Sequence, residues 1–293
     1  IRDTSVTGVQ TCALPISSSI RKNMPFFADI GKDASFLTSD KTYKVQNKID
    51  VKHSGPHGLV FTASETRAAG EGKDISGDVG ASWKKNALSA GVTVDINGNI
   101  KVNAAHASLI NGLKSTLNYG TTGTPSVELE YKTGNVGLKT KAPLAMGTIE
   151  SSVAMGLGDS LTAGAAVDFD ASKKSAKNIN IGAQYASGNI TLASSVALEK
   201  QDISVSYVQQ LTDDLKIGAA ATFGSADPTV RIGMKLALDK DSSITGRVSS
   251  SGLIQAAYAQ KLRQGLSISL TGDVSAHALS KQNIGVGISL ASQ

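Results

Sequence analysis

Apolar and polar residues alternate with a period of two from Lys44 almost to the end of the chain, and this pattern restricts the fold more than any other feature. The runs Thr229-Val-Arg-Ile-Gly-Met-Lys-Leu-Ala237 and Asn283-Ile-Gly-Val-Gly-Ile-Ser-Leu290 are typical. Because successive side chains of a β-strand point to opposite faces, each run predicts a strand with one apolar and one polar face. Turn-forming pairs such as Asn97-Gly98 separate the runs, as in β-hairpins. We therefore predict an antiparallel sheet of consecutive strands.

The number of strands decides how such a sheet closes. We count about nineteen segments between Lys44 and Ala291, which leaves roughly 13 residues for each strand with its turn. A tilted strand that crosses a bilayer needs ~9–11 residues, so this spacing fits short turns. With an odd number of antiparallel strands, the first and the last run in the same direction. Closure would therefore join the segments that begin at Lys44 and at Asn283 as a parallel pair.

The apolar face of so long a sheet needs a cover. Open twisted sheets rarely exceed ~10 strands, and closure into a barrel removes unpaired edges. The apolar positions are mostly Ala, Gly, Val and Ile, and only 4% of all residues are aromatic, whereas a sandwich core is rich in large side chains. No run of ~18 apolar residues is present, which excludes a helical membrane protein. We predict an all-β fold, a single transmembrane antiparallel β-barrel with its apolar face on lipid and its polar face around water. A soluble β-sandwich or solenoid is the alternative.

The residues before the strands follow a different period. Phe26, Phe27, Ile30, Ala34 and Leu37 recur at spacings of three and four, which is the apolar stripe of an amphipathic helix. This helix is too short to span a bilayer and must lie on another surface. We expect the helix and its linker at residues 24–43 and the barrel at residues 44–292.

The first 23 residues are unlike the rest of the chain. The run Thr7-Gly-Val-Gln-Thr-Cys-Ala-Leu-Pro-Ile16 resembles the conceptual translation of a sequencing-library adapter. We expect residues 1–23 to be a non-native lead; a targeting peptide, favoured by its basic residues and serines, is the alternative. The lead contributes +2 to the net charge of +5 and holds the single cysteine, Cys12. One cysteine excludes a disulfide framework and a thiolate metal cluster.

Segments at both ends of the chain resemble one protein family. Residues Met24 to Thr38, Met-Pro-Phe-Phe-Ala-Asp-Ile-Gly-Lys-Asp-Ala-Ser-Phe-Leu-Thr, are similar to the N-terminal helix of the eukaryotic voltage-dependent anion channels, the mitochondrial porins. Further segments resemble its early strand and its last strands: Gly58–Thr62, Ser243–Ile254, Tyr258–Gly272 and Lys281–Leu290. The likeness covers residues 24–291. This family is known for nineteen strands, so the resemblance implies that number and a helix inside the lumen, with Phe26, Ile30 and Leu37 against the wall.

The resemblance also implies a function, a voltage-gated channel that passes small ions and metabolites such as nucleotides, phosphate and organic anions. Selectivity in such a pore comes from the charges that line it. The pore-lining basic residues we expect to interact with anions lie in the polar register of the strands or on and just after the helix: Lys32, Lys41, Lys48, Lys52, Arg231 and Lys235. Acidic residues such as Glu128 and Glu130 partly offset them. We expect a weak preference for anions.

The last strand carries a second likeness. Asn283, Gly285, Ile288 and Leu290 are similar to the sorting signal of mitochondrial outer-membrane barrels, although the alternation of an ordinary strand nearly generates the same pattern. No secretory signal follows Met24. We therefore expect a multi-pass β-barrel of the mitochondrial outer membrane. The linker Ser39-Asp-Lys-Thr-Tyr-Lys44 has no glycine where animal members have a glycine-rich hinge, which weakens the case for gating by a swinging helix.

Other classes of function find little support. The four histidines lack the spacing of a helical zinc site, and Gly72-Lys73-Asp74 lacks the flanking residues of a phosphate loop. We expect no enzyme, no catalytic residues, no metal and no cofactor, and the dispersed basic residues predict no nucleic-acid partner. Expected partners are membrane lipids, small anions and nucleotides as permeants, and either a second copy or other mitochondrial membrane complexes. The alternatives to a metabolite channel are the protein-import pore of the same membrane, which would carry longer extensions, and a soluble β-rich binding protein.

Overall fold

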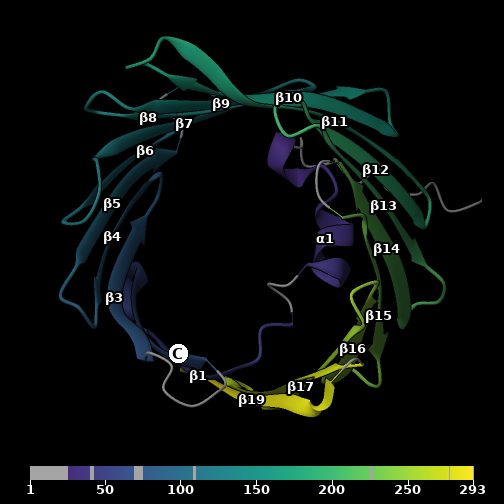
Figure 1. Ribbon diagram of the computed structural model, residues 1–293. Coiled ribbons are helices and arrows are strands. Elements are labelled where there is room, and N and C mark those ends of the chain that lie inside the picture. The colour runs from purple at the N-terminus through teal and green to yellow at the C-terminus, as the bar shows by residue number, and fades with distance from the viewer. Residues whose placement is uncertain are drawn as a thin grey trace, which may run out of the picture.

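A ring of strands encloses a short helix in the computed structural model of the protein (Figure 1). The structure describes residues 26–39, 43–68, 75–107, 110–224, 227–276 and 278–292. The predicted lead at residues 1–23, the candidate pore residue Lys41 and the run 72–74 lie outside the described residues, as does His277.

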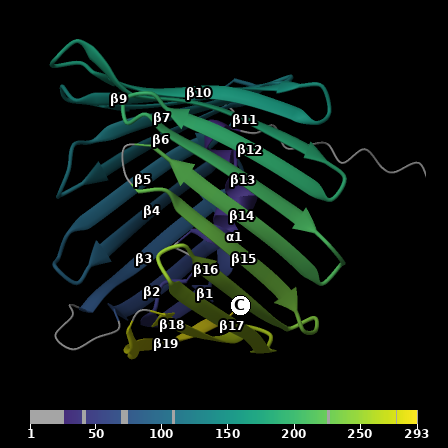
Figure 2. The same cartoon turned by 45° about the vertical axis from the view of Figure 1, so that its right-hand side comes forward.

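Nineteen strands follow one another over the described part of the chain, and each pairs with its neighbours in sequence. Their bounds are β1 Gln46–Ser54, β2 Leu59–Ala68, β3 Ile75–Lys85, β4 Leu88–Asp95, β5 Ile100–Ala107, β6 Leu113–Gly120, β7 Ser126–Thr133, β8 Val136–Pro143, β9 Thr148–Leu157, β10 Leu161–Asp170, β11 Ser175–Ser187, β12 Ile190–Ala197, β13 Asp202–Gln210, β14 Leu215–Phe223, β15 Thr229–Ala237, β16 Ser242–Ser249, β17 Leu253–Arg263, β18 Leu266–Ser275 and β19 Ala278–Ser292. Figure 2 shows the strands inclined to one another around the ring.

The barrel closes through a parallel pair. In this pair Lys48 of β1 lies opposite Gly287 of β19, and His53 lies opposite Ser292. The neighbouring pairs, β1–β2 and β18–β19, are antiparallel. The expected all-β barrel of about nineteen strands and its parallel closing pair are therefore confirmed.

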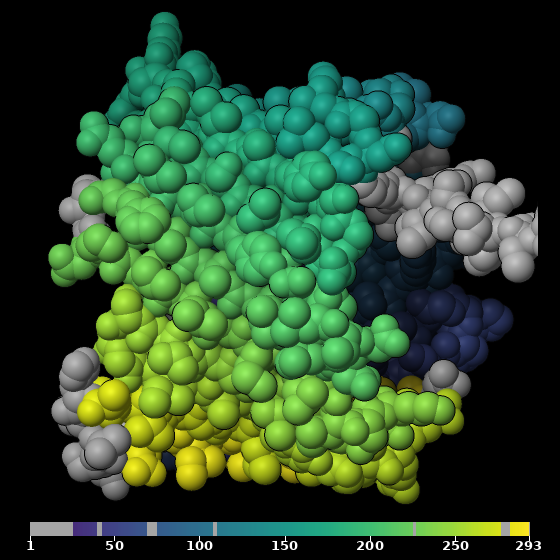
Figure 3. All heavy atoms as spheres, turned by 90° about the vertical axis from the view of Figure 1, so that its right-hand side faces the viewer, coloured from purple at the N-terminus to yellow at the C-terminus, as the bar shows by residue number. Residues whose placement is uncertain are grey.

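Alternate residues of each strand divide into an inner and an outer set. On β15, Gly233 lies against the helix residue Leu37, so the neighbouring positions Ile232 and Met234 face outward. Outward side chains of this kind are exposed and apolar, with 61% of Ile232 and 71% of Ile284 accessible. Figure 3 shows the outside of the barrel over the green and yellow C-terminal strands. Because a soluble sandwich would bury such residues, this arrangement argues against that alternative.

The N-terminal stripe forms two short elements rather than the single helix expected from its spacing. A 3₁₀-helix, η1, spans Phe27–Asp29, and the α-helix α1 spans Lys32–Thr38. Gly31 separates them because its φ of +73° is left-handed, a conformation that glycine adopts without strain. Another 3₁₀ turn, η2 at Pro56–Gly58, joins β1 to β2. Within the described residues no helix is long and apolar enough to cross a membrane.

The two faces of the wall predict different responses to a charge. Leu117 faces outward on β6, with 46% of its surface exposed, and the adjacent Asn118 faces inward, opposite Asn103 and Ser126. Leu117→Arg should lower the free energy of unfolding in lipid by about 2–4 kcal/mol, because it places a cation in hydrocarbon. The matched change Asn118→Arg should cost less than ~1 kcal/mol. Urea unfolding in liposomes checks both values, and equal losses would contradict the assignment of faces.

Candidate functional site

The helix lies on a row of inward-facing glycines. Gly164, Gly182, Gly218 and Gly233 belong to β10, β11, β14 and β15 and lack a side chain where the helix meets the wall. A Cβ on Gly218 would lie 2.8 Å from Leu37 Cδ1, and one on Gly233 would overlap the Leu37 carbonyl oxygen. Leu37 is fully buried and packs with Ala34 and Val208. The missing side chains therefore let α1 approach β14 and β15, and let Phe27 and Ile30 pack on β10 and β11.

The other two expected helix anchors occupy different surroundings. Ile30 lies at β11, where a Cβ on Gly182 would be 3.4 Å from Ile30 Cγ2. Phe26 is half-buried, and the Lys132 ammonium of β7 lies 4.2 Å from the centre of its ring, a cation–π contact. Phe27 is the aromatic residue that packs on the wall, close to both Gly164 and Gly182. The Gln184 side chain also accepts a 2.8 Å hydrogen bond from the Gly31 N–H.

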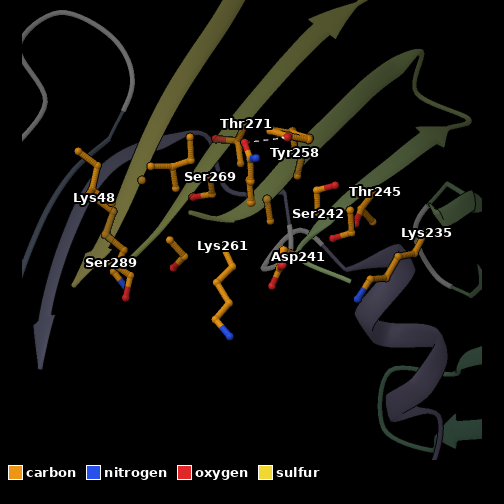
Figure 4. Close-up of a pocket in the computed structure, with 18 of the residues that line it drawn as sticks. Lys48, Lys235, Asp241, Ser242, Thr245, Tyr258, Lys261, Ser269, Thr271 and Ser289 are labelled. Atoms are coloured by element: carbon orange, nitrogen blue, oxygen red, sulfur yellow. Dashed lines mark hydrogen bonds between the residues drawn. The ribbon is translucent and has the colours of Figure 1, made fainter. Parts of the chain in front are cut away.

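A large hollow of the lumen lies between α1 and the strands β1 and β15–β19 (Figure 4). Its volume is about 660 Å³. Five lysines and three aspartates line it, together with many hydroxyl groups: Lys44, Lys48, Lys235, Lys240, Lys261, Asp50, Asp239 and Asp241 are the charged members. We call this part of the wall the basic arc. Figure 4 shows Lys235 and Lys261 extending into the same open space.

Two of the three aspartates of the basic arc, Asp50 and Asp239, have partners close by. The Lys48 ammonium lies 2.8 Å from an Asp50 carboxylate oxygen. Asp239, in the turn before β16, accepts hydrogen bonds from the Ser242 hydroxyl and from the N–H groups of Asp241 and Ser242. These donors, the Ser242 hydroxyl foremost, hold the pKa of Asp239 below its ordinary value. Lys235 lies 5.2 Å from the Phe36 ring centre, and Lys261 is exposed. The arc therefore presents positive charge to the lumen.

A second set of charges, on β6–β9, forms ion pairs across neighbouring strands. Lys139 bonds to both Glu128 and Glu130, at 2.7 and 3.0 Å, and Lys114 lies 3.0 Å from Glu130. Lys141 pairs with Glu150 at 3.2 Å. Three lysines and three glutamates are paired here, while Lys132 of the same wall lies over the Phe26 ring. Glu128 and Glu130 thus bind lysines of their own wall and lie away from the lysines of the basic arc.

Of the predicted pore residues that the structure describes, Lys48 and Lys235 lie in the basic arc. Lys32 is 73% exposed and lies 3.2 Å from Asp29. Lys52 lines a separate hollow with Arg263, and Arg231 lines a cavity of about 250 Å³ between α1 and β12–β15. Lys44 and Lys261 also belong to the arc but were not among the predicted residues, although the polar register of their segments would have indicated them.

The residues similar to a sorting signal lie at the closing seam. Gly285 has room only for hydrogen, because a Cβ there would overlap the backbone of Gln46 at the start of β1. Asn283 donates a 2.8 Å hydrogen bond to Asp273. Ile288 and Leu290 pair with Ile49 and Val51 of β1. These contacts are a structural reason for the residue types, and a role in sorting stays a prediction. The described residues hold no group of His, Cys, Asp or Glu suited to a metal ion.

The sequence is similar over most of its length to known porins and voltage-gated channels. The sequence model of the eukaryotic porin family matches residues 23–287. The mitochondrial outer membrane protein porin of Candida albicans is 26% identical, over 90% of this chain and 97% of its own. The non-selective voltage-gated ion channel VDAC2 of Homo sapiens is 26% identical, over 96% of this chain and 97% of its own.

A plastid relative and a solved porin structure are also similar to this chain. The outer plastidial membrane protein porin of Pisum sativum is 25% identical, over 92% of this chain and 98% of its own. Among solved structures, a triple mutant of the Rhodopseudomonas blastica porin has a TM-score of 0.51 at 9% identity, covering 78% of this chain and 96% of its own. This structural likeness concerns the fold alone.

The close contact between the glycines and the helix predicts that one added methyl group lowers the stability of the protein. Gly233→Ala should lower the free energy of unfolding in detergent by about 1–3 kcal/mol, because the new Cβ overlaps the backbone of Leu37. Gly272→Ala, on the outer face of β18, is the matched control, since its Cβ would meet only the Asn283 carbonyl oxygen at 3.6 Å. Its effect should stay within ~0.5 kcal/mol. Denaturant unfolding followed by circular dichroism measures both, and an unchanged Gly233→Ala protein would disprove this docking mode.

Proposed function

The chain belongs to the eukaryotic porin family, and we propose that it is a voltage-gated channel of the mitochondrial outer membrane. It lets small ions and metabolites, including nucleotides, phosphate and organic anions, pass with a weak preference for anions. The observation that carries the proposal is the closed barrel itself, apolar outside and polar within, with a hollow of about 660 Å³ beside the helix. Such a lumen can hold water and small solutes.

The separation of charges inside the barrel supports the anion preference. On β6–β9 all three glutamates are paired with lysines, while the basic arc carries five lysines against three aspartates. A solute that passes between α1 and β15–β19 therefore meets a positive potential, which raises the local concentration of anions. Salt screens this potential over about 10 Å, so the bias is weak. A weak bias also suits a relative whose name describes a non-selective channel.

The relatives support the membrane and the class of activity. The fungal relative is named for the mitochondrial outer membrane and the pea relative for the outer plastidial membrane. The mitochondrial location is the one we propose, in agreement with the seam residues Asn283, Gly285, Ile288 and Leu290. The named relatives are porins and ion channels, which favours conduction of solutes over enzymatic chemistry and over protein import. Lipids would cover the outer face, and contacts with a second copy or with other complexes of that membrane belong to the same proposal.

Reconstitution tests the channel function directly. In a planar bilayer, the purified protein should give a large conductance that falls to a partly closed level at both voltage polarities. A membrane that stays electrically silent, with protein shown to be inserted and folded, would contradict the proposal. A conductance that is blocked by presequence-like peptides would instead indicate a protein-import pore.

Reversal of single charges tests the basic arc. Lys235→Glu should lower the anion-to-cation permeability ratio by roughly a factor of two. The substitution changes the local charge by two units, and a solute several ångströms away feels this change through screening salt water. Lys32→Glu should have a smaller effect, because Lys32 is 73% exposed and already paired with Asp29. The control is Lys85→Glu, which makes the same change of net charge at an outward-facing position opposite Leu88. Reversal potentials in a tenfold KCl gradient measure all three, and equal shifts would place selectivity in the net charge rather than in the arc.

A further inference from the structure

The C-terminal end of α1 is held by a cluster of buried polar residues in an otherwise open lumen. Thr38 ends the helix, Tyr43 follows in the linker, and Arg247 and Gln255 project from β16 and β17. Their exposures are 4%, 1%, 3% and 7%. A guanidinium is rarely buried so deeply unless its donors are used, because removing a charge from water is costly.

Each member of the cluster contacts another. Arg247 donates one hydrogen bond to the Thr38 carbonyl oxygen and another to the Gln255 side-chain oxygen. Its guanidinium carbon lies 4.9 Å from the centre of the Tyr43 ring. Gln255 donates in turn to the Tyr43 carbonyl oxygen, at 3.4 Å. The contacts therefore form a connected set that joins the helix, the linker and two strands.

The Tyr43 hydroxyl ties the same elements together. It lies 2.9 Å from the Leu37 carbonyl oxygen and 3.0 Å from that of Gly246 on β16, and its one proton can be shared between them. Burial raises the pKa of Tyr43 to about 12, against the opposing effect of the Arg247 charge. The phenol thus remains a donor over the whole physiological range of pH.

Helix chemistry explains why a cation belongs at this place. The last carbonyl groups of a helix have no partner within it and carry the negative end of its dipole. Leu37 and Thr38 supply such carbonyls, and they receive Tyr43 and Arg247. The planar, forked guanidinium satisfies two acceptors in fixed directions, which a lysine ammonium does less well.

We infer that Arg247 is a positioning residue, which caps α1 from the barrel wall and holds its C-terminal half and Tyr43 on β16 and β17 in the open channel. Its positive charge is used inside the protein and contributes little to the attraction of passing anions, unlike that of Lys235 or Lys261. The consequence for conduction rests on the proposed channel function, but the docking of the helix does not.

Cysteine labelling tests the docking without any measurement of current. Ala34 is 3% exposed on the side of α1 that faces the wall, so Ala34→Cys in a Cys12→Ser background should react slowly with an uncharged, water-soluble thiol reagent in liposomes. Adding Arg247→Met should raise the labelling rate at least tenfold, because the undocked helix exposes the cysteine. Lys261→Met removes the same charge from the same side of the lumen and should leave the rate unchanged.

Further variants keep the test decisive. Arg247→Lys retains the charge without the fork and should give an intermediate rate. Gln255→Leu removes one acceptor and should also raise the rate, which covers the case in which Arg247→Met does not fold. Equal rates in Arg247→Met, Gln255→Leu and the parent would overturn the inference, as would an equal rise in Lys261→Met. In bilayers, Arg247→Met should broaden the distribution of open conductances. If the protein does not conduct but shows the expected labelling pattern, the proposed channel function is refuted and the capping role of Arg247 is retained.

Discussion

Peptide groups find no hydrogen-bond partner in hydrocarbon, and the whole architecture depends on this constraint. Each strand must be paired on both sides, so a sheet in a membrane has to close. Nineteen strands close only if the two at the seam run in parallel, as β1 and β19 do. The closed wall then fixes the rest, since every side chain points either to lipid or to the lumen.

The lumen is divided by the pairing of its charges. On β6–β9 the strand register brings Lys139 between Glu128 and Glu130, so opposite charges meet at 2.7 and 3.0 Å. On the other side the basic arc keeps lysines beside hydroxyl groups, and α1 narrows the passage next to them. The same number of charges in a different register would give a pore with another selectivity. Position rather than net charge sets the potential that a solute meets.

Much of the fold follows from the sequence, because the period of two is local and repeats in every strand. Runs such as 229–237 and 283–290 predicted the faces, and the odd count predicted the parallel seam. The docking of the N-terminal segment, η1 and α1, was harder to predict from the sequence. It depends on glycines of four separate strands, such as Gly164 and Gly233, which only the strand register brings together. The split at Gly31 is local but rests on one left-handed residue, which the apolar spacing does not reveal. The ion pairs of Lys139 with Glu128 and Glu130 were likewise not predictable, because they depend on which residues lie opposite each other on neighbouring strands.

The parallel seam has a consequence for how the protein is made. His53 and Ser292 touch across it although 239 positions separate them in the sequence. This contact can form only after all the strands between the two residues have been synthesised. The barrel therefore closes only after β19 has been made, and a chain that lacks this strand is left with two open edges.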